Sequence, residues 1–266
     1  MIANLDRIKL GYDDSGRENG FPVIFLHGFP HHRGLWAPQL ASLSSQARCI
    51  ALDLRGFGES TVAPPYSMDQ YADDVAAFMD SLRIDRAVIC GLSMGGYVAF
   101  SMWRRHRSRI HALVLADTRA SADSEEGREK RRAMAQMARE RGTTAVADAT
   151  ITGMVGKHTR ETSPLIVDQV YRILAKAPVA GVVGALEAMR EREDSTSTLA
   201  TIDVLTLIIV GEDDVLTPVS DSEAMHRAIY GSRLQVLARA GHVSNLERPA
   251  AFNHILSEFL AVARHA

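Results

Sequence analysis

Gly91-Leu92-Ser93-Met94-Gly95 is the stretch of sequence that decides the fold of this chain. It follows an apolar run typical of a buried strand, residues 87–90, and precedes a helix-compatible segment, residues 97–103. A serine between glycines at a strand-to-helix turn matches the G-x-S-x-G nucleophile elbow, in which the turn leaves the hydroxyl exposed. The pentapeptide alone is common, whereas its place between a strand and a helix is the context that the motif requires. The sequence therefore predicts that Ser93 is a nucleophile.

The rest of the chain alternates between short apolar runs and longer helical patterns. The runs cover residues 23–26, 49–52, 112–115 and 207–210, and the helical windows cover about 67–82, 94–107, 219–230 and 249–263. Strands that are apolar along their whole length belong to a parallel sheet covered on both faces. The alternation predicts an α/β fold with a doubly wound, mostly parallel sheet and helices on both faces. Residues 7–12 alternate between polar and apolar side chains, which favours an antiparallel edge strand.

One long region, from about residue 118 to 203, has helical patterns and no strand pattern. We expect it to form a helical cap, inserted before the last two strands of a single domain that spans residues 1–266. Its first helix, residues 124–141, mixes acidic and basic side chains around Met134 and Met137, which is typical of a solvent-exposed helix. A later helix begins at Pro178 and has one apolar face. That face either covers the ligand-binding edge of the sheet or packs against the core.

Composition narrows the classes of protein and partner. The formal net charge is −2, 46% of the residues are hydrophobic and 23% are charged, which is typical of a soluble protein with a sizeable core. Without an excess of basic residues, nucleic acid and acidic membranes are unfavoured as partners. The two cysteines, Cys49 and Cys90, lie in apolar runs, which favours a cytoplasmic protein without disulfides. The N-terminal residues have no signal-peptide pattern. The composition leaves the oligomeric state open.

Two further kinds of catalytic side chain follow predicted strands. The apolar run that ends at residue 210 leads into a loop with Asp213 and Asp214, and another apolar run precedes His242. Because the carboxyl ends of parallel strands meet at one edge of a sheet, we expect Ser93, an aspartate and His242 to lie together. A serine needs a base to remove its proton, and a carboxylate fixes the tautomer of a histidine base. The spacing favours neither aspartate over the other.

Acyl-transfer chemistry also needs backbone N–H groups that stabilise an oxyanion. Met94 directly follows Ser93 at the start of a helix, where the helix dipole adds to the effect. The second donor is expected in the loop after the strand at residues 23–26. There Phe29 is the candidate, because Pro30 has no N–H to donate.

Nearly the whole chain resembles the α/β-hydrolase fold family. The matching stretches are residues 27–30, 53–60, 91–96, 211–218 and 241–249. In that family the acid stands three residues after the glycine that ends the strand, and the resemblance therefore selects Asp214 over Asp213. The elbow and residues 115–119 resemble the branch around 3-oxoadipate enol-lactonases and small-molecule carboxylesterases. The resemblance implies a cofactor-free serine hydrolase that cleaves small carboxylic esters or lactones through an acyl-enzyme on Ser93, with His242 as base.

Other activities fit the same three residues. Some cofactor-free perhydrolases resemble this chain and have a proline beside the oxyanion donor, as Pro30 is here. Carbon–carbon bond hydrolases also use a Ser-Met-Gly-Gly elbow. A third alternative, from another class, is a ligand sensor that retains a vestigial hydrolase activity and binds a protein partner.

Several remaining patterns are interpreted as structural. His27, His31 and His32 have no carboxylate or cysteine at ligand spacing nearby, so no metal site is predicted. The basic run at residues 104–109 follows a helix, where cations complement the dipole. The glycines at positions 56 and 58 lack the third glycine of a dinucleotide fingerprint. Asp53 and Arg55 are expected to hold their own loop.

Overall fold

The computed structural model describes residues 1–16 and 20–266 of the chain. Within these residues eight strands form one sheet in the spatial order β1-β2-β4-β3-β5-β6-β7-β8. The strands are β1 (Ile2–Asn4), β2 (Lys9–Asp14), β3 (Pro22–Leu26), β4 (Arg48–Leu52), β5 (Ala87–Leu92), β6 (Ile110–Ala116), β7 (Thr206–Gly211) and β8 (Arg233–Leu237). The β1–β2 and β2–β4 pairs are antiparallel, and the other pairs are parallel. The sheet is therefore mixed and mostly parallel, as the apolar runs predicted.

The prediction of an antiparallel edge strand at residues 7–12 is wrong in one respect. Strand β2 is antiparallel to β4, but it lies second in the sheet, because β1 pairs with its outer side and forms the edge. Strand β1 is only three residues long. A strand of that length has too few residues for a visible alternation, which explains why the sequence pattern missed it.

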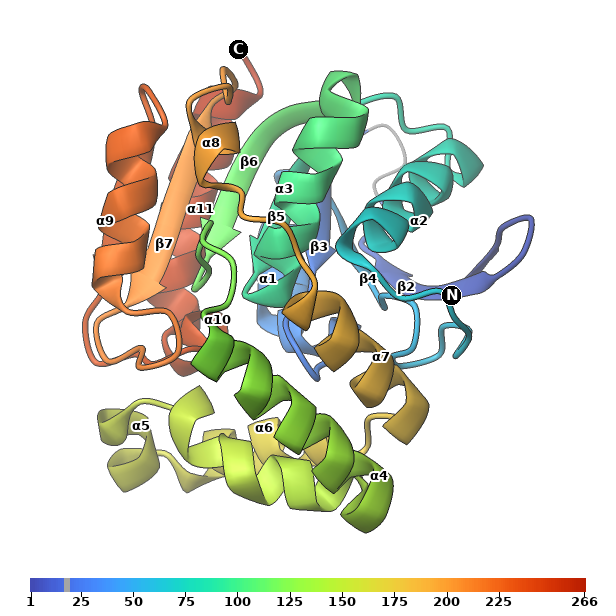
Figure 1. The fold of residues 1–266 in the computed structure, drawn as a ribbon. Coiled ribbons are helices and arrows are strands. Elements are labelled where there is room, and N and C mark those ends of the chain that lie inside the picture. Colours follow the sequence, from blue (N-terminus) through green and yellow to red (C-terminus); the bar gives the residue numbers. More distant parts are fainter. Residues whose placement is uncertain (17–19) are drawn as a thin grey trace.

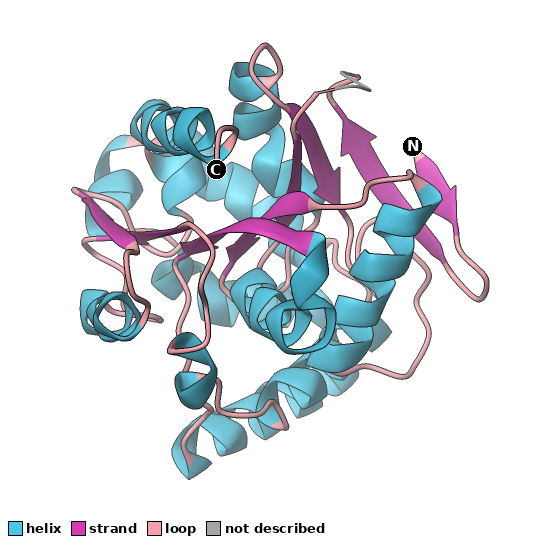
Figure 2. Cartoon of the chain, turned by 90° about the horizontal axis from the view of Figure 1, so that it is seen from above, coloured by secondary structure: helices cyan, strands magenta, loops and turns pink. Residues whose placement is uncertain are grey.

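Helices cover both faces of the sheet (Figures 1 and 2). Outside the region between β6 and β7 they are α1 (Ala37–Leu43), α2 (Met68–Ser81), α3 (Met94–His106), α9 (Val219–Ala228), α10 (Ser244–Glu247) and α11 (Pro249–Ala263), with 3-10 turns η1 (Arg33–Trp36) and η2 (Arg107–Arg109). Side chains of α2, α3 and α9 join the hydrophobic cluster on one face, and those of α1 and α11 join the cluster on the other. No helix among the described residues is long and apolar enough to cross a membrane.

The region between β6 and β7 consists of helices, and we call residues 118–203 the cap. Its helices are α4 (Glu125–Met154), α5 (Lys157–Thr162), α6 (Pro164–Ala175), α7 (Val179–Arg190) and α8 (Thr196–Leu199). In Figure 1, α4, α5 and α6 lie beyond the end of the sheet toward which the arrows of β6 and β7 point. Helix α4 is interrupted at Gly142, whose φ of 79° and ψ of 176° are not helical. The predicted helix at 124–141 is thus the part of α4 before this break.

The first part of α4 is not exposed on all sides, so its interpretation as a solvated helix is wrong for one face. Ala135 and Ala138 are buried, and Met134 and Met137 pack against the core. The charges that suggested a solvated helix occupy the other positions. Alanines contribute little to an apolar pattern in a charged segment, so the sequence did not indicate that this face is buried.

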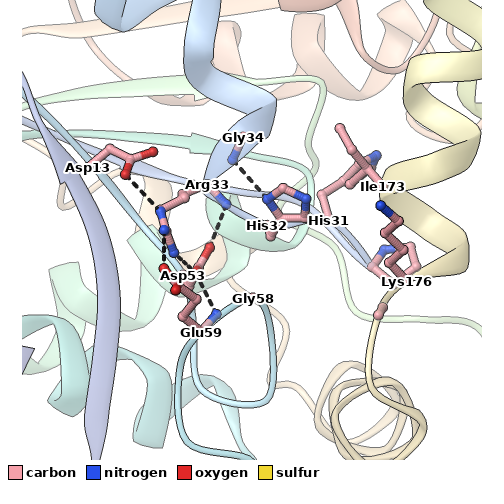
Figure 3. Close-up of a pocket in the computed structure, with 12 residues that line it drawn as sticks. Asp13, His31, His32, Arg33, Gly34, Asp53, Gly58, Glu59, Ile173 and Lys176 are labelled. Atoms are coloured by element: carbon pink, nitrogen blue, oxygen red, sulfur yellow. Dashed lines mark hydrogen bonds and ion pairs between the residues drawn. The ribbon is translucent and has the colours of Figure 1, made fainter. Parts of the chain in front are cut away.

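Ion pairs hold the loops at the carboxyl end of the sheet. Asp53, just after β4, accepts hydrogen bonds from the backbone N–H of Arg33 (2.7 Å) and of Glu59 (2.9 Å). The Arg33 guanidinium pairs with Asp53, with Glu59 and with Asp13, as Figure 3 shows. A buried pair joins Arg55 to the Asp74 carboxylate, 2.6 Å away. These contacts agree with the expectation that Asp53 and Arg55 hold their own loop.

Candidate active site

Ser93 lies at the turn between β5 and α3, in a backbone conformation that few residues adopt. Its φ is 54° and its ψ is −114°, which a non-glycine residue holds only when its surroundings enforce it. A Cβ atom at Gly91 would lie 2.3 Å from the carbonyl oxygen of Gly95, and one at Gly95 would lie 2.2 Å from that of Leu26. The flanking glycines are therefore required by close packing, and the strained turn presents the serine hydroxyl at the sheet edge.

His242 connects Ser93 to Asp214 through hydrogen bonds. Its Nε2 lies 2.8 Å from Ser93 Oγ, and its Nδ1 lies 2.8 Å from Asp214 Oδ2. All three residues are buried or nearly so, with exposed fractions of 9% for Ser93, 2% for His242 and 4% for Asp214. The structure thus brings together three residues that are 121 and 28 positions apart in the sequence. In this arrangement the imidazole can accept the serine proton while the carboxylate holds its other nitrogen.

The structure also separates the two neighbouring aspartates. Asp214 is the one that contacts His242, and its other oxygen, Oδ1, accepts from the backbone N–H groups of Leu216 (2.8 Å) and Thr217 (3.0 Å). The Thr217 hydroxyl donates to Oδ2 at 2.7 Å. Asp213 is only half-buried. The acid that the family resemblance selected is therefore the one hydrogen-bonded to the imidazole.

The pKa directions of the pair fit an ionised contact. Burial alone would lower the pKa of His242, but the negative charge and hydrogen bond of Asp214 outweigh it and raise the pKa above its usual value. For Asp214, burial favours the neutral form, but the charge of His242 and its hydrogen bonds hold the pKa below its usual value. An aspartate kept ionised beside an imidazole stabilises the imidazolium that forms when serine loses its proton.

Asp117 is a buried carboxylate that the sequence analysis missed. It follows β6 at the same sheet edge, and its oxygens accept from the backbone N–H of Gly211 (2.8 Å) and from the hydroxyl of Ser244 (2.5 Å). Burial and the nearby charge of Asp214 raise the pKa of Asp117 well above its usual value. Its position directly after an apolar strand is the same signal that identified Asp214, and this signal could have found it.

The two candidate oxyanion donors lie beside Ser93. Met94 is the first residue of α3, where a backbone N–H has no partner within the helix. Phe29 follows Gly28, whose Cβ atom, if present, would lie 3.1 Å from Ser93 Cβ. The loop after β3 is thus in contact with the nucleophile turn. The roles of Phe29 and Met94 as oxyanion donors stay predictions.

Ser93 and His242 open into a cavity of about 460 Å³ between the sheet and the cap. Apolar side chains from the cap line much of its wall, among them Met134, Met154 and Met189. Met189 belongs to α7, whose apolar face is otherwise buried in the core. The apolar face of α7 therefore packs against the core and also contributes, through Met189, to the cavity into which Ser93 opens.

Arginines form part of the wall of this cavity. Asp123, 7% exposed, pairs with Arg119 and Arg131, which line the cavity, and with Arg192, which does not. Burial alone would raise the pKa of Asp123, but Arg131 and Arg192 lower it to about 2. Asp221 adds a second negative charge near Arg119, so two carboxylates face three guanidinium groups. The excess positive charge in a partly enclosed site favours a negatively charged ligand group.

Among the histidines near the oxyanion loop, His27 has structural hydrogen bonds, whereas both ring nitrogens of His31 are buried without a hydrogen-bond partner in the described part of the chain. His27 Nε2 accepts from the backbone N–H of Leu54 at 3.0 Å, and Nδ1 lies 2.8 Å from the carbonyl oxygen of Gly28. Burial lowers the pKa of His27 to about 4 and that of His31 to about 3, so both are neutral at pH 7. In the part of the chain that the structure describes, no group of three or more His, Cys, Asp or Glu side chains could hold a metal ion.

The fold and the site agree with a known family. Residues 22–249 match the model of the alpha/beta hydrolase fold. The chain belongs to the α/β-hydrolase fold family. Its long helical region between β6 and β7 and its serine at the turn after β5 are therefore features of an α/β-hydrolase chain.

Three relatives cover nearly the full length of this α/β-hydrolase. 3-Oxoadipate enol-lactonase 1 of Acinetobacter baylyi is 30% identical to it over 260 residues, which is 98% of this chain and 96% of the relative. A thermophilic esterase from Thermogutta terrifontis has a TM-score of 0.94 at 36% identity, covering 99% of this chain and 98% of its own. The enol-lactonase from Burkholderia xenovorans LB400 has a TM-score of 0.90 at 32% identity, covering 98% and 100%. The chain is thus an α/β-hydrolase related to enol-lactonases and esterases.

Proposed function

We propose that this α/β-hydrolase is a serine hydrolase that cleaves carboxylic esters or lactones of small molecules through an acyl-enzyme on Ser93. The observation that carries the proposal is the hydrogen-bonded chain from Ser93 Oγ through His242 to Asp214, with 2.8 Å at each step. It opens into a cavity that suits a small substrate, since ligand cavities in proteins are typically several hundred Å³. The relation to enol-lactonases and esterases supports the same reaction class.

The reaction follows from this geometry. His242 Nε2 accepts the proton of Ser93 as Oγ attacks the substrate carbonyl, and Asp214 stabilises the imidazolium. The resulting oxyanion is stabilised by the backbone N–H groups of Phe29 and Met94. The imidazolium then protonates the leaving alkoxide, which departs as an alcohol from an ester and stays attached to the acyl group in a lactone. A water molecule, deprotonated by His242, releases the acid and restores Ser93.

The charge of the cavity narrows the substrate class within this proposal. Arg119 and Arg131 line the same cavity as Ser93, and both contact the carboxylate of Asp123. A substrate whose acyl chain ends in a carboxylate would place this charge near the guanidinium groups. We therefore expect acidic esters or lactones to be preferred over neutral ones of equal length.

Hydrolysis of p-nitrophenyl esters, from acetate to octanoate, tests the function. Wild type is compared with Ser93→Ala, whose folding is checked by circular dichroism. We expect turnover by wild type and a loss of roughly four to six orders of magnitude in the variant. Substantial esterase activity in Ser93→Ala would refute the assignment. A folded wild type without turnover of these esters would instead favour a lactone substrate, carbon–carbon bond cleavage or the ligand sensor.

A further inference from the structure

Glu247 is a buried carboxylate close to His242 that does not line the cavity. It ends the short helix α10 and is 5% exposed. Its Oε1 accepts from the backbone N–H of Gly241 at 2.8 Å, and its Oε2 accepts from that of Gly156 at 2.9 Å. Burial raises the pKa of Glu247, and these two backbone donors, together with the nearby Thr159 hydroxyl and Val243 backbone N–H, oppose that rise. All of these groups are neutral, so none of them cancels the charge of the ionised carboxylate.

The donors come from two parts of the chain that are distant in sequence. Gly241 directly precedes His242, so the carboxylate is bonded to the backbone next to the imidazole. On the other side of His242, the carbonyl oxygen of Val243 accepts from the backbone N–H of Glu247. Gly156 lies between α4 and α5, and Thr159 lies in α5, so both belong to the cap. Glu247 therefore joins the loop of the histidine to the cap.

The two loops that Glu247 joins are also in direct backbone contact. A Cβ atom at Gly156 would lie 2.7 Å from the backbone nitrogen of Gly241, and one at Gly241 would lie 2.3 Å from that of Gly156. Gly156 has an ordinary φ of −61°, which any residue adopts. Its glycine is therefore explained by the close approach of the loops, and any side chain there would push the histidine loop away from the cap.

We propose that Glu247 is a positioning residue for His242, which fixes the backbone directly before the imidazole to the cap and contributes negative charge that favours the imidazolium. This inference rests on the proposed hydrolase function. The charged or titratable groups that act on the imidazole from other elements are Asp214 after β7, Asp117 after β6 and His31 after β3. Glu247 is one of three carboxylates around it, and the one that joins it to the cap.

Glu247→Gln tests the proposal, because the side chain keeps its size but loses its charge. The amide NH₂ of the glutamine takes the place of one acceptor oxygen, and because it cannot accept from the backbone N–H that it faces, one hydrogen bond is lost. We expect kcat for p-nitrophenyl acetate to fall about 10- to 100-fold, the loss that misplacement by about 1 Å causes. KM should change little, since Glu247 does not line the cavity. The ¹⁵N NMR titration of His242, assigned by its absence in His242→Asn, should move to lower pH.

Two further variants keep this test decisive. Gly156→Ala leaves the carboxylate in place but crowds Gly241, and we expect it to lower kcat from the cap side. Glu223→Gln is the matched control, because it makes the same chemical change at an exposed residue of α9 whose carboxylate pairs with Arg227 on the same helix. This control should retain wild-type kcat and the wild-type titration of His242.

A merely structural role for Glu247 would lower the melting temperature and leave both kcat and the His242 titration unchanged. That result in a folded Glu247→Gln overturns the proposal. If this variant does not fold, an unchanged kcat in Gly156→Ala overturns it instead. The NMR titration needs no substrate, so a wild type that hydrolyses neither esters nor lactones refutes the proposed function, whereas an unshifted His242 titration refutes the role of Glu247.

Discussion

Replacing Asp214 with asparagine should abolish most of the catalysis, for a reason that the hydrogen bonds specify. Asp214 Oδ1 accepts from two backbone N–H groups, those of Leu216 and Thr217. These donors will hold the carbonyl oxygen of the asparagine, so its NH₂ group takes the place of Oδ2 and points at His242 Nδ1. The NH₂ group can only donate there, so Nδ1 must become the acceptor. The proton then moves to Nε2, which faces Ser93 and can no longer accept its proton.

The wrong tautomer sets the size of the effect. Loss of the correct tautomer in a serine, histidine and aspartate triad lowers kcat by about 10⁴-fold, which corresponds to about 5.4 kcal/mol at 1.36 kcal/mol per factor of ten. We therefore expect kcat for p-nitrophenyl acetate to fall about 10⁴-fold in Asp214→Asn. Stability should fall much less, because the packing and the two backbone hydrogen bonds remain.

Asp213→Asn is the matched control, because it makes the same chemical change at the adjacent, half-buried residue. We expect kcat within about threefold of wild type, as for most surface substitutions away from a site. Both variants are assayed with p-nitrophenyl acetate after their melting temperatures have been measured. A folded Asp214→Asn that keeps more than a tenth of the wild-type kcat, or a larger loss in Asp213→Asn, would refute the tautomer argument.

Two other predictions follow from the charges of the site. Because the pKa of His242 is raised above its usual 6.5, the imidazole stays protonated to a higher pH. We therefore expect kcat/KM to rise with pH through a midpoint above 6.5, and a midpoint well below this value would contradict the role of His242 as the base. Arg131→Gln should reduce the preference for p-nitrophenyl hydrogen adipate over p-nitrophenyl hexanoate by about tenfold, the effect of one charge-assisted hydrogen bond of about 1.5 kcal/mol. Arg132→Gln, whose guanidinium pairs only with exposed Glu125 and Glu129, should leave this preference unchanged, and equal ratios in all three proteins would exclude the arginine cluster from substrate selection.

The sheet and its three central site residues could be predicted because local patterns suffice for them. Ser93, Asp214 and His242 each follow an apolar run, and the ends of parallel strands meet at one edge whatever the length of chain between them. The choice between Asp213 and Asp214 depends on the turn after β7. An aspartate favours a turn when its side chain accepts from backbone N–H groups two or three residues further along the chain. Asp214 does so with the N–H groups of Leu216 and Thr217.

Most of the buried charges could not be predicted in the same way, because a sequence pattern does not show which charges are paired. Asp117 carried a signal, its place directly after an apolar strand, whereas Glu247 did not stand out among the many surface carboxylates, because carboxylates are rarely buried. Asp123 in the cap pairs with Arg192, which is 69 positions further along the chain. Such a pair requires the whole cap to fold, and the spacing of charges in residues 124–141 is equally compatible with a solvated helix.

The residues proposed to carry out the reaction and those that line the substrate cavity belong largely to different parts of the chain. Ser93, His242 and Asp214 lie on turns that follow β5, β8 and β7, and the side-chain hydrogen bonds that join these three residues do not involve the cap. The contact from the cap is to the backbone, where the Thr118 hydroxyl donates to the carbonyl oxygen of Ser93. The cavity wall opposite them comes largely from the cap, through Met134 and Arg131 of α4 and other residues. Substitutions in this wall can change the size and charge of the accepted acyl group while the hydrogen bonds of the triad stay intact. Glu247 holds the segment that follows α4 against the histidine loop, whereas the part of α4 before Gly142 packs against the core through Ala135 and Ala138. Substitutions that alter the accepted substrate are therefore expected at the cavity-facing positions of this part of α4, Arg131 and Met134, and not at its buried alanines.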